Sequence, residues 1–409
     1  MRNNNLIGNS FQKSLSYMMG SDYSGYDPYD GAWSDYTLIN GRKYIRLLST
    51  YINKFSPLNL RPVLKIKKSK QNQALAFIGR AMLSFPDAYL SEINKIADHL
   101  TADSLIGKYG FHCWDAHGFP IQMRNGYKPI GCTDVIGTEA IGRFFFELDA
   151  LKPGQAYREI CASVNDFIHN NLRVWNNGLH YFRYTPETKN SKWCYNASII
   201  AAVFVARSSK HYGLDYDESF VDNAVRDVIS RQKADGSWYY SLDLESGYEK
   251  PQIDFHQGFI LDAILEYMEL HGFEEPYVST YKRGLEFYRT KQFFPNGQGV
   301  YRYPRKYPVN IHNQAQGIIT FTKASAAGFG NLYFDFARTI AGWTIANMQD
   351  PDGHFYYLKY PLFTNKIPYI RWSDASMAYA LSVYLSNEKS LINHDNSRIS
   401  RTSGSLSSF

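Results

Sequence analysis

The sequence predicts an all-α protein, an (α/α)6 toroid in which six helical hairpins form an inner and an outer ring. Five aromatic segments, each opened by a glycine, recur at intervals of 56 to 68 residues, and they begin at Gly110, Gly178, Gly236, Gly297 and Gly353. This interval is about the length of two helices and two connections, so each unit should be one helical hairpin. An amphipathic helix precedes each aromatic turn and a more apolar helix follows it, which is typical of alternating outer and inner helices.

The expected pairs of helices follow one another along the chain. They cover residues 35–51 with 71–83, 86–102 with 133–148, 153–172 with 193–206, 220–229 with 258–268, 275–293 with 311–324, and 331–348 with 372–385. The turns between them should be short strands or β-turns at one rim, where glycine permits a positive φ. The predicted boundaries are an N-terminal extension and turn segment (1–34), a single toroid domain (35–385) and a disordered polar tail (386–409).

Composition narrows the functional classes. The 409 residues carry a net charge of +6, and 44% of them are hydrophobic, which suits a globular chain. No signal peptide or membrane-spanning stretch is evident, so we expect a soluble, cytoplasmic protein. The four cysteines lack zinc-ligand spacing, no cofactor fingerprint occurs, and no nucleic-acid-binding pattern is present; we therefore expect no metal, no cofactor and no nucleic-acid partner. A basic run between Arg61 and Lys70 indicates a solvated loop or a site for an anionic glycan or lipid phosphate.

The candidate site lies where the inner helices begin, because their N-termini should point at one common cavity. Polar residues gather at these positions in five units: Asp134; Tyr195 and Asn196; Asp254, His256 and Gln257; His312, Gln314 and Gln316; and Arg371 and Asp374. N-capping is an alternative explanation for the aspartates. It explains the histidines and glutamines less well, since buried imidazoles and amides need partners.

Aromatic residues near the same rim suit a carbohydrate, because their faces stack on the C–H surfaces of sugars. The candidates are Trp114, Trp193, Trp238 and Trp372, while the alternative is packing between turns and helices. The turn-rich segment Gly25-Tyr-Asp-Pro-Tyr-Asp-Gly31 contains Asp27 and Asp30. It is either an ordinary turn or a source of a carboxylate, Asp30, for the cavity.

The repeated hairpins resemble the six-hairpin glycosidase class, which includes unsaturated glucuronyl hydrolases and related lyases and C5-epimerases. Five segments are similar to proteins of bacterial surface-polysaccharide biosynthesis, and the likeness runs from about Tyr23 to Leu385. These segments begin at Gly25, Asp254, Asn310, Trp343 and Tyr369. Asp235-Gly-Ser-Trp238 also resembles the repeats of squalene-type cyclases, but the acidic motifs of terpene chemistry are absent. The resemblance implies a carbohydrate-active toroid without settling its reaction.

Three functions remain open, and the sequence ranks glycoside hydrolysis of a bacterial, acidic polysaccharide or oligosaccharide first, a uronate lyase or C5-epimerase second and a glycan binder third. Glycoside hydrolysis needs an acid and a second carboxylate, and Asp254 with Asp374 is the best pair, with His256 and His312 tuning protonation and Arg371 orienting a carboxylate. A uronate lyase or C5-epimerase would use His256, His312, Tyr303, Gln314 and Arg371 to remove a proton and stabilise an enolate. A non-catalytic glycan binder would need only the aromatic residues. The expected partner is a poly- or oligosaccharide, with peripheral association with polysaccharide-assembly machinery as a further expectation.

Overall fold

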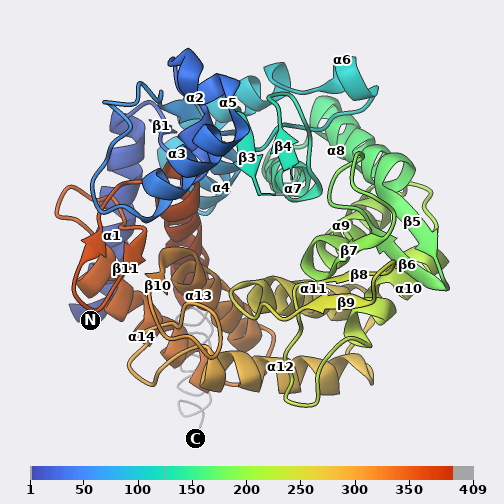
Figure 1. The fold of residues 1–409 in the computed structure, drawn as a ribbon. Coiled ribbons are helices and arrows are strands. Elements are labelled where there is room, and N and C mark those ends of the chain that lie inside the picture. Colours follow the sequence, from blue (N-terminus) through green and yellow to red (C-terminus); the bar gives the residue numbers. More distant parts are fainter. Residues whose placement is uncertain (1, 125, 390–409) are drawn as a thin grey trace, which may run out of the picture.

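The computed structural model describes residues 2–124 and 126–389 and has the predicted toroid (Figure 1). Six inner helices surround the centre. They are α4 (Asn72–Leu83), α7 (Val135–Leu151), α9 (Tyr195–Tyr212), α11 (His256–His271), α13 (Ile311–Ala326) and a last inner helix (370–389), which opens with a π-helical segment at Ile370–Ala375. The last inner helix contacts both α13 and α4, so the ring is closed.

The outer ring covers the inner one. Its helices are α1 (Arg2–Gly20), α5 (Pro86–Ala102), α8 (Gln155–Phe167, extended by the π-helical Ile168–Leu172), α10 (Glu218–Ile229), α12 (Tyr277–Lys291) and α14 (Asn331–Met348). Each outer helix buries one apolar stripe; on α10 the stripe contains the predicted Phe220, Ala224 and Val228. The core lies between the two rings, and no described helix is long and apolar enough to span a bilayer.

The first hairpin differs from the prediction, because its outer helix is α1 and not the segment 35–51. Ile7, Phe11 and Leu15 of α1 follow helical spacing and are buried. A Cβ on Gly353 would lie 2.4 Å from the carbonyl oxygen of Lys13 in α1, as one on Gly297 would lie 2.6 Å from that of Thr339 in α14. The same turn-to-helix contact therefore continues through α1, and the predicted extension 1–34 begins with a helix of the ring.

The segment 35–51 forms an insertion outside the ring. It contains α2 (Thr37–Gly41) and the first part of α3 (Lys43–Phe55), which contacts the short 3-10 helix Asp30–Ala32 and strand β3. Strands β1 (Ser24–Gly25) and β2 (Ser69–Lys70) pair where the chain enters and leaves this insertion, and a further short helix, α6 (Ile106–Tyr109), follows α5.

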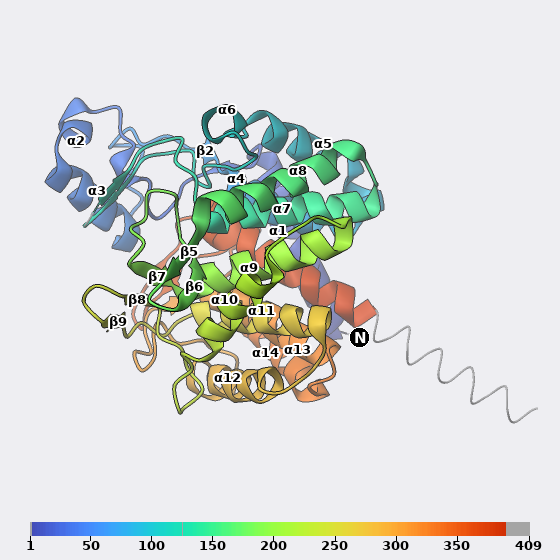
Figure 2. The same cartoon turned by 90° about the vertical axis from the view of Figure 1, so that its right-hand side faces the viewer.

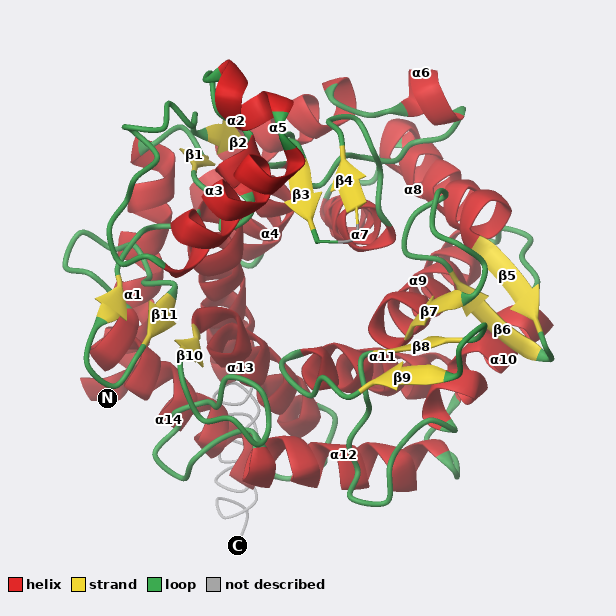
Figure 3. Cartoon of the chain, viewed as in Figure 1, coloured by secondary structure: helices red, strands yellow, loops and turns green. Residues whose placement is uncertain are grey.

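The remaining strands gather at the end of the ring where the inner helices begin (Figures 2 and 3). They are β3 (Ile121–Met123) and β4 (Gly126–Lys128), β5 (Arg173–Asn176) and β6 (Leu179–Phe182), β7 (Lys192–Cys194), β8 (Ser241–Asp243) and β9 (Tyr248–Lys250), and β10 (Val309–Asn310), β11 (Leu358–Lys359) and β12 (Thr364–Asn365). All pairs are antiparallel, and the β7–β8 and β10–β11 pairs join neighbouring units. We call this end of the ring the mouth.

The aromatic turns have the predicted backbone. All five opening glycines have a positive φ, between 76° and 109°. In every unit a backbone amide of the turn donates to a polar side chain in the first turns of the next inner helix. The acceptors are Thr138 for Trp114 (3.2 Å), Ser198 for Phe182 (3.1 Å), Gln257 for Trp238 (2.9 Å), Gln314 for Gly299 (2.7 Å) and Asp374 for Phe355 (2.7 Å). In these five units, a polar side chain at this position therefore holds the preceding aromatic turn in place.

The C-terminal boundary also moves slightly. The last inner helix continues through residue 389, where Glu388 is buried and accepts a hydrogen bond from Tyr384 (3.1 Å). The rest of the predicted tail, 390–409, lies outside the described residues.

Candidate active site

The mouth brings together residues from three neighbouring inner helices. His312 of α13 lies with Nδ1 3.4 Å from the Trp372 carbonyl oxygen, and the Trp372 indole donates to Asn310 (3.2 Å). Arg371 donates to Gln73 of α4 (3.2 Å). The sequence prediction that these helix starts converge is therefore seen in the contacts among His312, Arg371 and Trp372.

Asp254 and His256 form a hydrogen-bonded carboxylate–imidazole pair at the start of α11. Asp254 is 2% exposed, and its Oδ1 meets Nδ1 of His256. Its Oδ2 accepts a hydrogen bond from Gln252 (2.7 Å) and lies 3.5 Å from Nε of Arg302. Burial alone would raise the pKa of Asp254, but His256 and Arg302 outweigh it and hold this pKa below its usual value. A carboxylate on Nδ1 leaves Nε2 of His256 as a base and stabilises the imidazolium that forms when it takes a proton.

His312 is a neutral imidazole in an aromatic box. Its ring stacks on Trp372 at 4.8 Å between centroids and meets the edge of Phe255 at 4.7 Å. Burial lowers the pKa of His312 to about 3 against the opposing effect of the Trp372 carbonyl. Because that carbonyl can only accept, Nδ1 carries the proton and Nε2 is left as an acceptor. His256 stacks on the same Phe255 ring at 4.3 Å, so both imidazoles flank one phenylalanine.

Two cations approach the Asp254–His256 pair. Arg302 is half-exposed, and Lys250 lies over the Tyr240 ring at 4.7 Å, whose edge in turn contacts His256 at 4.7 Å. Burial and the neighbouring Arg302 lower the pKa of Lys250, which makes it a better proton donor than a solvated lysine. Tyr240 ends the aromatic segment that begins at Gly236 but was not predicted as a site residue. No motif marks Lys250, because the pairing of β8 with β9 brings it here.

A second polar cluster lies at the start of α7. Lys128 of β4 donates to Asp134 (2.8 Å) and lies 3.5 Å from Asp115, while His117 is 3.9 Å from both carboxylates. Burial, Arg371 and Lys128 all lower the pKa of His117, so it is a neutral imidazole. Asp134 also accepts from Gly137 (2.9 Å) and is the N-cap of α7, as the alternative interpretation had it. His117 was not among the predicted site residues, although Asp115-Ala-His117 directly follows an aromatic turn.

The two aspartates of the N-terminal turn segment have different partners. Asp27 binds Arg371 (2.8 and 2.7 Å), so the carboxylate that Arg371 orients in the structure is that of Asp27. Asp30 is 1% exposed and pairs with the buried Arg61 (2.8 Å). Burial raises the pKa of Asp30 to about 6 against the effect of Arg61. Asp30 is therefore buried in an ion pair that packs the insertion against the chain before the last inner helix, since Arg61 also donates to the Tyr369 hydroxyl (3.0 Å).

Asp374 is also placed differently from the prediction. It is fully buried, its Oδ1 holds the amide of Phe355, and burial raises its pKa well above the usual value. Its position in the unit is that of Gln257 and Gln314, which hold the turns before their own helices. The geometry does not support Asp374 as the catalytic partner of Asp254, since a carboxyl behind the turn cannot reach a sugar at the mouth.

Most of the predicted aromatic residues pack in the core. Trp114 and Trp238 are fully buried and donate to the carbonyls of Leu100 (2.6 Å) and Val228 (3.0 Å), and Trp193 is fully buried as well. Trp372 is only partly buried and lies at the mouth.

Four further predicted residues have internal partners. Tyr195 donates to Glu249 (2.5 Å) and Asn196 accepts from Cys194 (3.1 Å). Tyr303 packs against Phe287 of α12 (5.4 Å), and Gln316 donates to Asp262 (3.1 Å).

Below the mouth, a cavity of about 100 Å³ is lined by residues of all six inner helices, including Gln73, His312 and Gln316. Ion pairs close its deeper part. Arg143 binds Glu266 (2.7 Å) and Lys323 binds Asp262 (3.3 Å). Burial alone would raise the pKa of Glu266, but Arg143 and Arg207 outweigh it and hold this pKa at about 2. The deep end of the cavity therefore offers Glu266 as an ion-paired carboxylate.

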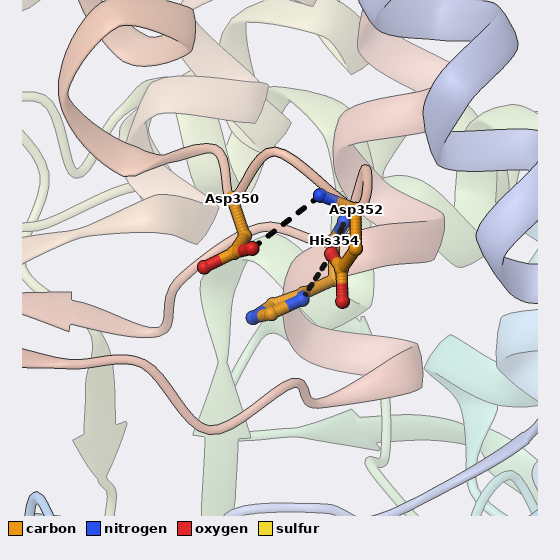
Figure 4. Close-up of side chains that lie close together, drawn as sticks. All are labelled: Asp350, Asp352 and His354. Carbon is orange, nitrogen blue, oxygen red and sulfur yellow. Dashed lines mark hydrogen bonds and ion pairs between the residues drawn. The ribbon is translucent and has the colours of Figure 1, made fainter.

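One group of three possible metal ligands, Asp350, Asp352 and His354, lies in the last aromatic turn (Figure 4). Nδ1 of His354 meets Asp352 at 2.6 Å, and its Nε2 meets the carbonyl of Lys366 at 3.0 Å. Asp350 accepts a hydrogen bond from Tyr356 (2.8 Å). These groups already satisfy one another as a turn, and both nitrogens of His354 are engaged.

The chain matches no protein-family model and no curated protein sequence. Solved structures of the same fold do match over most of its length. A GH76 alpha-mannanase from Bacteroides thetaiotaomicron is 15% identical, with 79% of this chain and 86% of that one covered and a TM-score of 0.59. A cellobiose 2-epimerase from Spirochaeta thermophila is 14% identical (78% and 86% covered, TM-score 0.58). An unsaturated glucuronyl hydrolase specific for heparin is 11% identical (94% and 98% covered, TM-score 0.57). The chain thus shares the six-hairpin toroid fold that the sequence predicted.

Proposed function

We propose that this protein is a carbohydrate-active enzyme that moves a proton to and from a sugar carbon next to a carbonyl group, as an epimerase or isomerase does. The observation that carries the proposal is the Asp254–His256 pair, a supported imidazole base at the mouth of the ring. Solved structures of similar fold include two cellobiose 2-epimerases and a D-mannose isomerase, which are consistent with such a reaction.

In the proposed reaction, His256 takes the proton from the sugar carbon through Nε2, and Asp254 stabilises the imidazolium. The electron pair moves to the carbonyl oxygen to form an enediolate. Lys250 and Arg302, the cations beside the pair, meet the developing negative charge, and Lys250 donates a proton to it. His256 then delivers its proton to the former carbonyl carbon while Lys250 recovers a proton from the second enediol hydroxyl, which gives the ketose of an isomerase. Delivery to the opposite face of the original carbon, after the enediol has turned in the site and with Lys250 recovering the proton that it gave, gives the epimer. His312 accepts a substrate hydroxyl, and Trp372 stacks against the ring.

Hydrolysis by two carboxylates fits less well. Carboxylates near the mouth are paired with cations: Asp254 with Arg302, and Asp134 with Lys128. The carboxyl groups with a raised pKa, Asp30 and Asp374, are both buried behind other residues. Neither of these two carboxyl groups is therefore placed to act as the general acid of glycosidic cleavage.

The test follows proton exchange at carbon. Purified protein is incubated in heavy water with reducing sugars (cellobiose, mannose and a uronate disaccharide), and proton NMR follows deuterium uptake and the appearance of the epimer or ketose. The wild type should exchange the proton next to the carbonyl, and His256→Gln should lose roughly a hundredfold or more of that rate. Asp374→Asn is the matched control and should retain it.

Other outcomes would contradict the proposal. New reducing ends without exchange would mean hydrolysis, and an ultraviolet-absorbing unsaturated uronate would mean a lyase. Binding of the sugars with no chemical change would favour the glycan-binding alternative.

A further inference from the structure

Helix α3 has its polar side buried and its apolar side in solvent. Its buried residues are Ser49, Thr50 and Asn53, of which Asn53 donates to the Ser49 carbonyl (2.9 Å). The opposite side is strongly exposed: Tyr44 is 79% accessible, Leu48 59%, Tyr51 48%, Ile52 40% and Phe55 37%. We call these five residues the α3 face. An exposed apolar surface of this kind on a soluble chain marks an interaction site.

The apolar surface continues beyond the helix. Leu58, just after α3, is 68% exposed, and Leu362 is 97% exposed. The loop that carries Leu362 is tied to the end of α3, because Asn365 donates to the carbonyl of Ser56 (2.9 Å). Two segments separated by some three hundred residues therefore lie next to each other, and each has a strongly exposed leucine.

The surroundings of the α3 face are basic. From Tyr36 to Lys70 the sequence contains nine lysines and arginines and no acidic residue. Arg61, Lys67 and Lys70 pair with aspartates from outside this segment. The other six, which are Arg42, Lys43, Arg46, Lys54, Lys65 and Lys68, have no carboxylate partner among the described residues. The segment thus carries a strong positive excess beside exposed apolar side chains.

We propose that the α3 face binds the surface of an anionic lipid bilayer, with α3 lying in the plane of the headgroups. An amphipathic helix with tyrosine, leucine and phenylalanine on one side and lysines and arginines beside them has the chemistry of an interfacial helix. At 13 residues α3 is too short to span a bilayer. The lysines and arginines without a carboxylate partner complement anionic headgroups, whereas a neutral or basic partner would leave these positive charges unmatched.

The inner side of α3 connects this surface to the mouth. Lys54 donates to the hydroxyl of Tyr29 (2.7 Å), whose ring meets Trp372 at 5.7 Å, and Arg46 donates to Gln122 of β3 (2.9 Å). In Figure 2, α2 and α3 stand at the same end of the ring as β7, β8 and β9. Docking through the α3 face would therefore bring the mouth close to the bilayer, where it could reach a glycan held at the membrane. This inference does not depend on the reaction proposed above.

The test is cosedimentation of the full-length protein with vesicles of phosphatidylcholine alone or mixed equally with phosphatidylglycerol. Wild type should sediment with the mixed vesicles, and added salt should reduce the bound fraction. The double variant Leu48→Gln/Leu362→Gln should partition about tenfold or more weakly, because two leucines that the bilayer would bury are replaced by polar side chains. Leu332→Gln is the matched control, because Leu332 is 58% exposed on α14 of the outer ring.

The charge contribution has its own pair of variants. Lys43→Gln/Lys68→Gln should weaken binding to the mixed vesicles, whereas Lys282→Gln, an exposed lysine on α12, should not. Unchanged thermal unfolding of each variant excludes misfolding. Absence of wild-type sedimentation with mixed vesicles, or full binding by the double leucine variant, would overturn the proposal. A concentration-dependent dimer in light scattering that Leu48→Gln abolishes would also overturn it, since a second copy would then cover the face.

Discussion

Replacing Asp374 by asparagine should stabilise the protein, increasingly so as the pH rises. The carboxyl is fully buried, one oxygen accepts from Phe355 at 2.7 Å, and the other lacks a partner among the described residues. Burial raises its pKa well above 3.8, so the folded state holds a proton that the unfolded state releases. Stability is then fully present below pH 3.8 and is lost as the pH rises toward the folded pKa, with a slope of up to about 1.4 kcal/mol per pH unit.

The total can be bounded. If the folded carboxyl stays protonated up to neutrality, the loss is about 4 kcal/mol at pH 7. Asparagine keeps the acceptor for Phe355 and has no proton to lose. Asp374→Asn should therefore match the wild type near pH 4 and exceed it by roughly 1–4 kcal/mol at pH 7.

Urea unfolding followed by circular dichroism, at several values between about pH 4 and 8, measures this difference. Asp335→Asn, which changes an exposed carboxylate on α14, should show no comparable pH-dependent gain. An Asp374→Asn variant with the same pH profile as the wild type would refute a buried, protonated carboxyl. Normal stability combined with loss of activity would instead return Asp374 to the catalytic role predicted from the sequence.

Three other variants test separate parts of the structure. Gly353→Ala, at φ 109° and with its new Cβ 2.4 Å from the Lys13 carbonyl, should lose about 1–3 kcal/mol in urea unfolding, whereas Gly342→Ala in open space on α14 should gain slightly. Wild-type stability should fall as the pH drops from 6.5 toward 3, because His312 has a folded pKa of about 3, and His312→Gln should make this fall shallower in the same assay. Lys128→Met should cost about 3–5 kcal/mol by leaving two buried carboxylates unpaired, and a melting temperature equal to the wild type would contradict that pairing.

The fold could be predicted because the repeat appears in glycines and aromatic residues that the backbone requires. Gly236 and Gly297 have a positive φ and lie against a neighbouring outer helix. Because both conditions require glycine, the turns can be recognised in the sequence. Helix α1 was missed because its buried residues, such as Phe11 and Leu15, are separated by glutamine, lysine and serine, and no aromatic turn precedes it. What completes the ring is the contact of the last turn with α1, a pairing between chain ends that local patterns do not contain.

For a related reason, the candidate site could be predicted only in part from the sequence. Sequence places Gln257 and His256 side by side, yet α11 directs Gln257 back to its own turn and His256 to the mouth. On the last inner helix Asp374 likewise holds its turn, whereas Trp372, two positions earlier, contacts His312 at the mouth. Two consecutive residues on an α-helix point about 100° apart. At a helix start, one side chain can therefore hydrogen-bond to the preceding turn while its neighbour points into the cavity.

The repeat therefore explains why the inner helices begin with polar residues that hold the preceding turns. Only polar residues at the helix starts that do not hold a turn point to function. His256 and His312 are such residues, because neither holds a turn and both contact Phe255 at the mouth. Lys250 and Lys128 reach the mouth from strands outside the helical repeat. We therefore expect the chemistry of this toroid where side chains from the loops between hairpins lie beside helix residues that do not hold a turn. Exchanging those loop residues should alter the reaction while leaving the ring intact.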